Sequence, residues 1–290
     1  MKLVVTALVR WLAGAALLVG LLGLPGLAAA AAPGAGEAVA LAFDGATGTL
    51  LKARGDALSR SDDGGRHWAP VKLSPLAAPR SIASVAVSAG DKGAIYVAGP
   101  GIGVLRSDDG GRNWSARNEG LPGSNVTALA THAEQPDTVF AYVTGHGFFR
   151  SQDGGRRWQL MDAGPRSGIL RFVHSNMPGS MQTGWLFAAT GLGVRRAMDC
   201  FCGWRDAGEL GRPVRAIAYD PRQPRTVYAA TEDGLFLSAD GGEQWSRIST
   251  PVAAIGALAV TPDGIVYAVA GDGDLFRSGD GAKTWERVGA

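Results

Sequence analysis

The eight residues Ser107-Asp108-Asp109-Gly110-Gly111-Arg112-Asn113-Trp114 form the most regular motif of this 290-residue sequence. The motif keeps Ser at its first place, Asp at its third and Trp at its eighth, and a short apolar run precedes it each time. Five copies share this pattern, and they occupy residues 61–68, 107–114, 151–158, 238–245 and 278–285. The sequence therefore predicts a repeat protein.

The spacing of these copies predicts a sixth. The first three begin at residues 61, 107 and 151, whereas the step from 151 to 238 is about twice as long. Midway, residues 197–204 read Ala-Met-Asp-Cys-Phe-Cys-Gly-Trp, which keeps Asp and Trp but has lost the Ser and the turn glycine. A period of 40 to 46 residues is typical of one four-stranded propeller blade. We therefore expect an all-β propeller of four-stranded antiparallel blades, six in number, with seven as the alternative.

The motif has the chemistry of a tight turn between two strands. An Asp carboxylate accepts hydrogen bonds from several turn N–H groups, Ser closes a local bond, and Gly adopts the positive φ that the turn requires. The Trp then returns on the next strand and buries its apolar face between blades. The residues expected in these structural roles are Asp63, Asp109, Asp153, Asp199, Asp240 and Asp280, with Trp68, Trp114, Trp158, Trp204, Trp245 and Trp285. Because the same Asp serves every repeat, we interpret it as structural rather than catalytic.

This motif is the Asp-box of bacterial-neuraminidase-type repeats, and residues 38 to 288 resemble the β-propellers that carry it. The chain is most similar to photosystem II stability/assembly factor-like proteins, whose blades run through a comparable apolar strand into the box, as Gly147-Phe148-Phe149-Arg150-Ser151 does here. The resemblance implies a non-catalytic propeller that binds a membrane-protein partner through an arginine-bearing face.

Each repeat divides into four predicted strands. The innermost are expected at residues 39–43, 82–87, 126–131, 169–174, 214–219 and 255–260. The second strands carry an aromatic residue in five repeats, namely Tyr96, Phe140, Phe187, Tyr228 and Tyr267, which we expect to pack in the core. The last repeat holds all four of its strands, so the ring does not require a strand swapped from the N-terminus.

The first 32 residues predict a signal peptide, because Lys2 and Arg10 precede an apolar run that ends in an Ala-rich stretch. An uncleaved anchor is the alternative, and it would be the protein's one membrane contact. Residues 33–290 are then a single propeller domain, exported to the periplasm or secreted. Its Lys and Arg balance its Asp and Glu, and it has no basic runs, which argues against nucleic-acid binding.

The sixth motif contains both cysteines of the chain, Cys200 and Cys202. In an oxidising compartment we expect them to form a disulfide, which would hold a turn that has lost its Ser and Gly. Free thiols are one alternative. A soft metal bound with Met198, Met177 or Met181 is the other, although no matching His pair supports it. We expect neither a cofactor nor a metal.

An arginine precedes the motif in five repeats, with Leu237 as the exception. We expect these side chains to lie along their strands with solvated head groups. They are Arg60, Arg106, Arg150, Arg196 and Arg277.

The fourth repeat departs from the others in its inner strand. Arg171 stands where the other repeats have Ala or Ser, and a ten-residue connection follows that strand. Because an arginine near the axis needs an acceptor or channel water, we expect it either to contact a partner's carboxylate or to pair internally with Asp206. The candidate binding residues, all on the face opposite the boxes, are Arg171, His146, Arg212, Arg215, Arg80 and Asn125, the last in an Asn-Val-Thr glycosylation sequon.

Glycoside hydrolysis requires two facing carboxylates, or a tyrosine with a partner acid. The Arg-Ile-Pro motif of sialidases is absent, and no sequence pattern pairs the acidic loop residues. We therefore expect a protein-binding scaffold or assembly factor of the cell envelope without catalytic residues. A sialidase-like glycoside hydrolase or a carbohydrate-binding propeller is the alternative.

Overall fold

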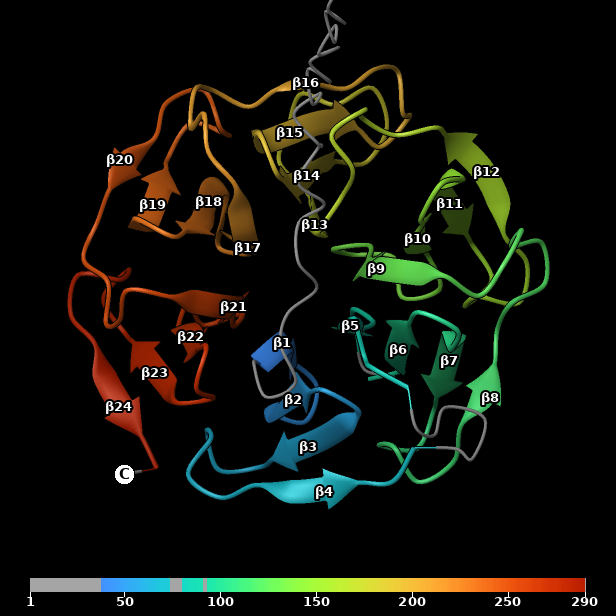
Figure 1. Ribbon diagram of the computed structural model, residues 1–290, viewed down its shortest axis with the longest axis horizontal. Coiled ribbons are helices and arrows are strands. Elements are labelled where there is room, and N and C mark those ends of the chain that lie inside the picture. The colour runs from blue at the N-terminus through green and yellow to red at the C-terminus, as the bar shows by residue number, and fades with distance from the viewer. Residues whose placement is uncertain (1–37, 74–79, 91–92, 290) are drawn as a thin grey trace, which may run out of the picture. The chain divides into compact units, whose positions relative to one another are not determined.

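The computed structural model describes residues 38–73, 80–90 and 93–289, and its regular elements are all β-strands (Figure 1). They form six antiparallel sheets of four strands, and the sheets are arranged as a ring of blades. This confirms the all-β propeller and its six blades. No helix in the described part of the chain is long and apolar enough to cross a membrane. The predicted signal peptide lies outside the described residues.

Each blade is built from four consecutive strands, so none of the described sheets borrows a strand from elsewhere in the chain. The first three blades contain β1 (Ala38–Asp44), β2 (Thr49–Arg54), β3 (Ala57–Ser61), β4 (Ala69–Val71), β5 (Ser84–Val87), β6 (Ile95–Gly99), β7 (Gly103–Ser107), β8 (Ser115–Ala116), β9 (Val126–Thr131), β10 (Val139–Val143), β11 (Gly147–Ser151) and β12 (Gln159–Asp162). The other three contain β13 (Arg171–Ser175), β14 (Trp185–Thr190), β15 (Gly193–Met198), β16 (Arg205–Asp206), β17 (Val214–Asp220), β18 (Gln223–Thr231), β19 (Gly234–Ser238), β20 (Ser246–Arg247), β21 (Ile255–Val260), β22 (Val266–Ala270), β23 (Leu275–Ser278) and β24 (Glu286–Val288).

The inner strands begin within two residues of the predicted positions. β1 begins one residue earlier than predicted, and the two larger differences lie at Ile82 and Ile169, which precede β5 and β13. The N–H of Ile82 donates to the carbonyl oxygen of Gly55 in blade one at 2.8 Å, so this residue joins two blades before its own strand begins.

The core lies between neighbouring sheets, where apolar side chains of one blade contact those of the next. The second-strand aromatics are buried as expected, with Tyr96, Phe140 and Phe187 among the largest fully buried side chains. Blades six and one pack in the same way through Leu41, Leu50, Tyr267 and Leu275. Side-chain packing therefore closes the ring, as the complete last repeat predicted.

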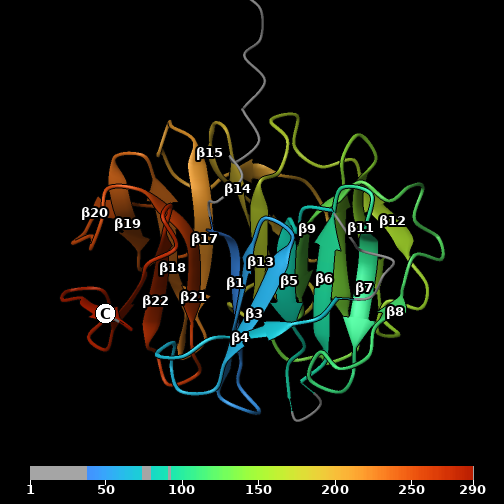
Figure 2. The ribbon, with the colours of Figure 1, turned by 60° about the horizontal axis from the view of Figure 1, so that its bottom comes forward.

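Neighbouring strands of a blade run in opposite directions, so their connections lie on two faces of the ring. In Figure 2 the strands run from one of these faces to the other. One face carries the turns between first and second strands and the Asp-box turns between third and fourth strands; we call it the box face. The other carries the turns between second and third strands and the links between blades; we call it the connector face. Loops on such a face are where propellers usually bind.

Candidate functional site

Five Asp-boxes share one set of hydrogen bonds. In blade two, Ser107 Oγ donates to Asp109 Oδ1 at 2.8 Å and accepts from the N–H of Gly111 at 2.8 Å. Asp109 Oδ1 also accepts from the N–H of Asn113 at 2.8 Å, and the bonds from Asn113 lower the pKa of this carboxyl to about 2. The same Ser-to-Asp bond recurs at Ser61, Ser151, Ser238 and Ser278. Each of these Asp residues stabilises its own turn.

Five box tryptophans, Trp114, Trp158, Trp204, Trp245 and Trp285, bridge blades through their indole N–H groups. Trp158 donates to the carbonyl oxygen of Arg117 in the preceding blade at 2.8 Å, and Trp245 donates to that of Ala207 at 2.7 Å. Only Trp158 is fully buried, at 4% exposure. The predicted interblade role of these residues therefore combines packing with a hydrogen bond.

Blade four breaks the box pattern, and the prediction that Asp199 stabilises its own turn is wrong. Ala197 replaces the box Ser, and the Asp199 carboxylate is buried, where it accepts from the N–H of Thr183 at 3.1 Å and from its hydroxyl. His174 Nε2 lies 3.5 Å from Asp199 Oδ2. Without the Ser hydroxyl, nothing holds the carboxylate over the turn, and it bonds to the preceding long connection instead.

His132 of blade three joins this buried group. Its ring stacks on that of His174 with centroids 3.9 Å apart, and its Nε2 lies 2.7 Å from Thr183 Oγ1. His132 lies at the end of its inner strand. The corresponding residues of the other blades are Asp44, Ser88, Ser175, Asp220 and Thr261, and all six side chains are buried. Each of these side chains accepts from a nearby backbone N–H, so His132 also has a turn-capping role.

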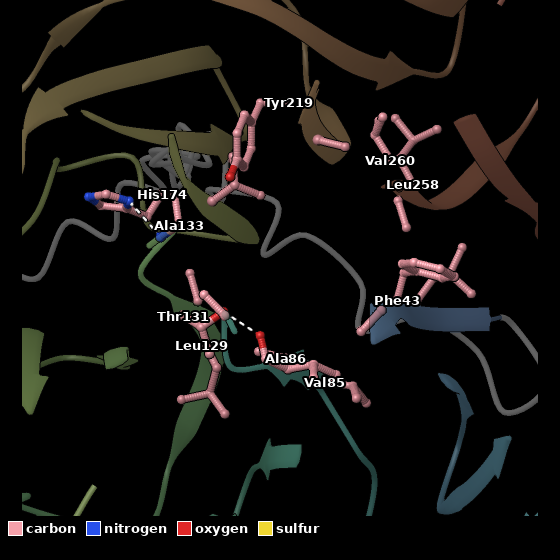
Figure 3. A pocket seen from close by; sticks show the side chains of 18 of the residues that line it. Phe43, Val85, Ala86, Leu129, Thr131, Ala133, His174, Tyr219, Leu258 and Val260 are labelled. Atoms are coloured by element: carbon pink, nitrogen blue, oxygen red, sulfur yellow. Dashed lines mark hydrogen bonds between the residues drawn. The ribbon is translucent and has the colours of Figure 1, made fainter. Parts of the chain in front are cut away.

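Backbone donors fix the tautomers of both histidines. His132 Nδ1 accepts from the N–H groups of Glu134 and Gln135, each at 3.0 Å. His174 Nδ1 accepts from the N–H of Ala133 at 3.1 Å, a bond drawn in Figure 3. A neutral imidazole carries one proton, so in both rings the proton is on Nε2. His132 then donates to Thr183, and Thr183 donates to Asp199.

This polarity does not fit a metal centre, although the ligand atoms of His132, His174 and Asp199 lie within 4.8 Å of one another. A metal-bound imidazole offers a lone pair to the ion and donates its other N–H to an acceptor. Here the second nitrogen of each ring faces a backbone donor, which leaves no lone pair on Nε2. We interpret the group as a hydrogen-bond network that holds blades three and four together.

Charge in this network is set by burial and hydrogen bonding. Burial lowers the pKa of His132 to about 4, and the neighbouring His174 adds to the effect. Burial alone would raise the pKa of Asp199, but the hydrogen bonds from His174 and Thr183 hold it at about 2. The network therefore contains a neutral His132 and an ionised Asp199 at neutral pH.

Cys200 and Cys202 form a disulfide with Cα atoms 5.4 Å apart. Between them Phe201 has a φ of 57°, in the left-handed region that glycine favours. The Phe201 ring is 6% exposed and contacts Phe140 and Phe148 of blade three, with centroids at 6.0 and 5.6 Å. The degenerate box therefore fills the interface with blade three by an aromatic side chain.

The expectation of solvated head groups is wrong for two of the recurring arginines. Arg106 Nη1 donates to the carbonyl oxygen of Gly154 in the next box at 2.9 Å, and Arg196 makes the equivalent bond to Gly241. Their side chains are 11% and 5% exposed. Arg60 lies 3.4 Å from the Gly110 carbonyl oxygen in the same arrangement. These side chains connect one blade to the box of the next.

A cavity of about 480 Å³ runs along the ring axis and is lined by the inner strands of all six blades (Figure 3). Its walls are largely Ala, Val and Leu, and Phe43, Thr131 and Tyr219 are among the larger side chains that line it. Burial raises the pKa of Tyr219 to about 12. No Asp or Glu is among the described residues that line this cavity, so its wall does not supply the carboxylate pair of a glycosidase.

Arg171 is the charged side chain of the cavity wall, which His132 and His174 also line. It is half-buried at the first position of β13, on the connector-face side of the ring. Its Nη1 donates to the carbonyl oxygen of Leu170 at 2.6 Å, and burial lowers its pKa to about 10, so it stays charged at neutral pH. The alternative pair with Asp206 does not form, because Asp206 pairs with Arg195.

The other predicted binding residues also lie on the connector face, but not all are available. Arg80 donates to the Gly101 carbonyl oxygen at 2.7 Å, and Arg212 pairs with Asp233. His146, Arg215 and Asn125 are exposed.

Two leucines beside Arg171 are exposed, which no sequence pattern predicted. Leu170 is 37% exposed immediately before β13, and Leu192 is 74% exposed in the turn between β14 and β15. The N–H of Leu170 donates to the carbonyl oxygen of Ala189 at 2.9 Å, which places both residues at the same end of blade four. With Arg171 they form a mixed apolar and cationic patch, which we call the blade-four mouth.

Comparison with known families identifies the relationship. The model of the family described as photosynthesis system II assembly factor YCF48 matches residues 35–181, about half of the chain. This protein belongs to the YCF48 family. No curated protein matches the sequence significantly.

Solved YCF48 structures are similar to this YCF48-family chain in fold. One is described as YCF48 bound to D1 peptide, with 19% identity and a TM-score of 0.55 over 87% of this chain and 82% of that one. YCF48 from Cyanidioschyzon merolae has 21% identity and a TM-score of 0.53 over 89% and 86%.

A glycoside hydrolase fold is similar as well. The GH74 enzyme of Niastella koreensis has 17% identity and a TM-score of 0.60 over 87% of this chain. This YCF48-family chain spans about half the length of the GH74 enzymes that it matches, 47% in this case. At such identities the likeness shows the propeller fold alone.

Proposed function

We propose that this protein is a non-catalytic scaffold, an assembly factor that binds a segment of another protein at the blade-four mouth. The observation that carries the proposal is Arg171 at the cavity entrance, flanked by the exposed Leu170 and Leu192. A guanidinium binds a carboxylate with two parallel hydrogen bonds, and the leucines offer apolar area to the same segment. We therefore expect a partner segment with a carboxylate next to apolar residues.

Family membership supports this kind of partner. A solved YCF48 protein is bound to a D1 peptide, so a related propeller holds a peptide. The signal peptide predicted at residues 1–32 further supports action outside the cytoplasm, in the cell envelope.

A photo-crosslinking amino acid at Leu192 tests the proposal in the full-length protein expressed in its own cells. Met181 is the matched control, because it is 75% exposed, against 74% for Leu192, but lies in the turn between β13 and β14 on the box face. We expect one discrete crosslinked protein from position 192, none from position 181, and loss of the crosslink on Arg171→Ala with a melting temperature within a few degrees of wild type. Equal crosslinking at both positions would contradict the mouth as the binding site, as would a large loss of stability in the variant.

Carbohydrate is the second candidate ligand, because GH74 enzymes share the propeller fold. Hydrolysis of a glycan requires paired carboxylates, which the described wall of the axial cavity does not contain. We expect no turnover of xyloglucan or of a fluorogenic sialoside. Turnover that survives purification and disappears on substitution of a connector-face acid such as Glu209 would establish the hydrolase instead.

A further inference from the structure

We propose that Cys200–Cys202 is a redox-reactive site, opened by a dithiol that attacks the exposed Cys202, and that its reduction releases Phe201 from the interface between blades three and four. The proposal rests on the conformation of Phe201, on its ring contacts and on the unequal exposure of the two cysteines. It is independent of the partner-binding mouth on the opposite face.

The backbone of the box turn in blade four differs from that of the other blades at one position. The fifth box position is Gly in four blades and Ala282 in blade six, with φ between 67° and 94°, and its N–H donates to the box Ser. In blade four this position is Phe201, whose N–H donates to the Met198 carbonyl oxygen instead. A bulky residue in the left-handed region is strained relative to its preferred conformation, because its Cβ crowds the backbone. The disulfide joins the residues on either side of Phe201 and holds it there.

The left-handed conformation of Phe201 places its ring among aromatic side chains of blades three and four. Phe201 belongs to a cluster that contains Phe140, Phe148 and Phe172, and its ring also contacts Trp204 at 6.4 Å. Phe140 in turn stacks on His174 with centroids 5.5 Å apart. The disulfide turn therefore extends the network of His132, His174 and Asp199, and both join the same two blades.

The two cysteines differ in how accessible they are to a reductant. Cys202 is exposed, whereas Cys200 is half-buried. A thiolate of the dithiol attacks Cys202 Sγ, a mixed disulfide forms, and Cys200 leaves as a thiolate that takes a proton. The second thiolate then attacks the sulfur of the reductant in that mixed disulfide and releases Cys202. Two electrons pass from the dithiol, which becomes a disulfide, to the protein, which becomes a dithiol.

The consequence is a change in one interface. Once the bond is open, Phe201 can return to the right-handed or extended backbone that its side chain prefers. Its ring then withdraws from Phe140 and Phe148, and that packing is lost between blades three and four. The disulfide lies within blade four, between β15 and β16, and joins no other blade covalently.

The first experiment measures reaction in the native protein. Dithiothreitol is titrated without denaturant, and alkylated cysteines are counted by mass spectrometry. We expect both cysteines to react below the concentration that unfolds the chain. With glutathione disulfide as probe, Cys200→Ser, which retains the exposed Cys202, should form a mixed disulfide roughly tenfold faster than Cys202→Ser. Resistance to the reductant until global unfolding, or equal rates for the two variants, overturns the proposed site.

The second experiment measures the interface. Hydrogen exchange of oxidised and reduced protein should show faster exchange in β10 and β13 after reduction, and unchanged exchange in β22 of the distant blade six. Phe201→Gly introduces the glycine that four other boxes have at this position and removes the aromatic ring, so its exchange in β10 should not respond to reduction. Unchanged exchange in reduced wild-type protein, or an equal response in Phe201→Gly, overturns the release of Phe201.

Discussion

At the scale of single residues, His132 is buried in a form that disfavours protonation. Both of its nitrogens are engaged, with Nδ1 accepting from two backbone N–H groups and Nε2 donating to Thr183. A second proton on Nδ1 would face those backbone donors and the stacked ring of His174. The cost of charging this ring is therefore a property of the interface between blades three and four.

This burial predicts a loss of stability in mild acid. The pKa of His132 is about 4 in the folded protein and ordinarily about 6.5 in an unfolded chain. Because the unfolded state binds the proton more tightly, stability is full above pH 6.5 and falls as the pH is lowered toward 4. Urea unfolding at pH 7, 6, 5 and 4 measures this slope.

Two variants separate this effect from general acid sensitivity. His132→Asn retains an acceptor for the turn N–H groups and should flatten the slope between pH 6.5 and 4. His146→Asn is the matched control, because His146 is exposed and should leave the slope unchanged. An identical slope in wild type and His132→Asn would show that another group titrates.

The hydrogen bonds of the box serine predict how its loss or gain changes stability. Ser107 Oγ bonds both Asp109 and the buried N–H of Gly111, so Ser107→Ala should destabilise the protein by about 1–2 kcal/mol. The reciprocal change Ala197→Ser should bring no comparable gain, because Asp199 has turned away to Thr183. Thermal unfolding of both variants checks this. A gain in the second variant equal to the loss in the first would mean that blade four keeps the common box.

At the scale of elements, the third strand of a blade stabilises the next blade through its arginine. Arg106 donates to Tyr96 Oη at 3.0 Å and to the Gly154 carbonyl oxygen, and it pairs with Asp108. Arg106→Ala should therefore cost about 1–3 kcal/mol, since it leaves a buried carbonyl without its charged donor. The control is Arg277→Ala, because Arg277 is 37% exposed and pairs with Glu286 in its own blade. That variant should lose less than about 1 kcal/mol. Urea unfolding that ranks the two variants in the opposite order would contradict this role.

The elements that depend on local sequence patterns were predictable. The spacing of the boxes gave six blades, and the strands followed from apolar runs bounded by Gly, Pro and Asp. The contacts of blade four were not predictable, because His132, Thr183 and Asp199 meet only through tertiary structure. The loss of Ser and Gly from residues 197–204 was the visible signal, and it indicated the anomalous blade without showing that its Asp is buried. The sequence predicts a binding site centred on Arg171, and this stays a prediction. The exposure of Leu192 was not predictable, because it depends on a turn that the sequence does not specify.

At the scale of the whole molecule, the ring is closed by packing between blades six and one. Leu275 contacts the box of blade one, where a Cβ at Gly65 would lie 2.1 Å from its side chain. Leu275→Ala should therefore weaken closure, with a loss of about 2–4 kcal/mol for a fully buried leucine. Hydrogen exchange should increase first in β1 and β21, which measures opening at this interface. Faster exchange at every blade equally would indicate global unfolding instead.

Because every described sheet is made of four consecutive strands, each blade corresponds to one uninterrupted segment of the sequence. Duplication or deletion of one segment of about 40 residues adds or removes a complete blade and cuts no sheet. Such a propeller can therefore change its blade number in a single genetic step, and its ends can be joined and reopened between any two blades to give circularly permuted chains that fold.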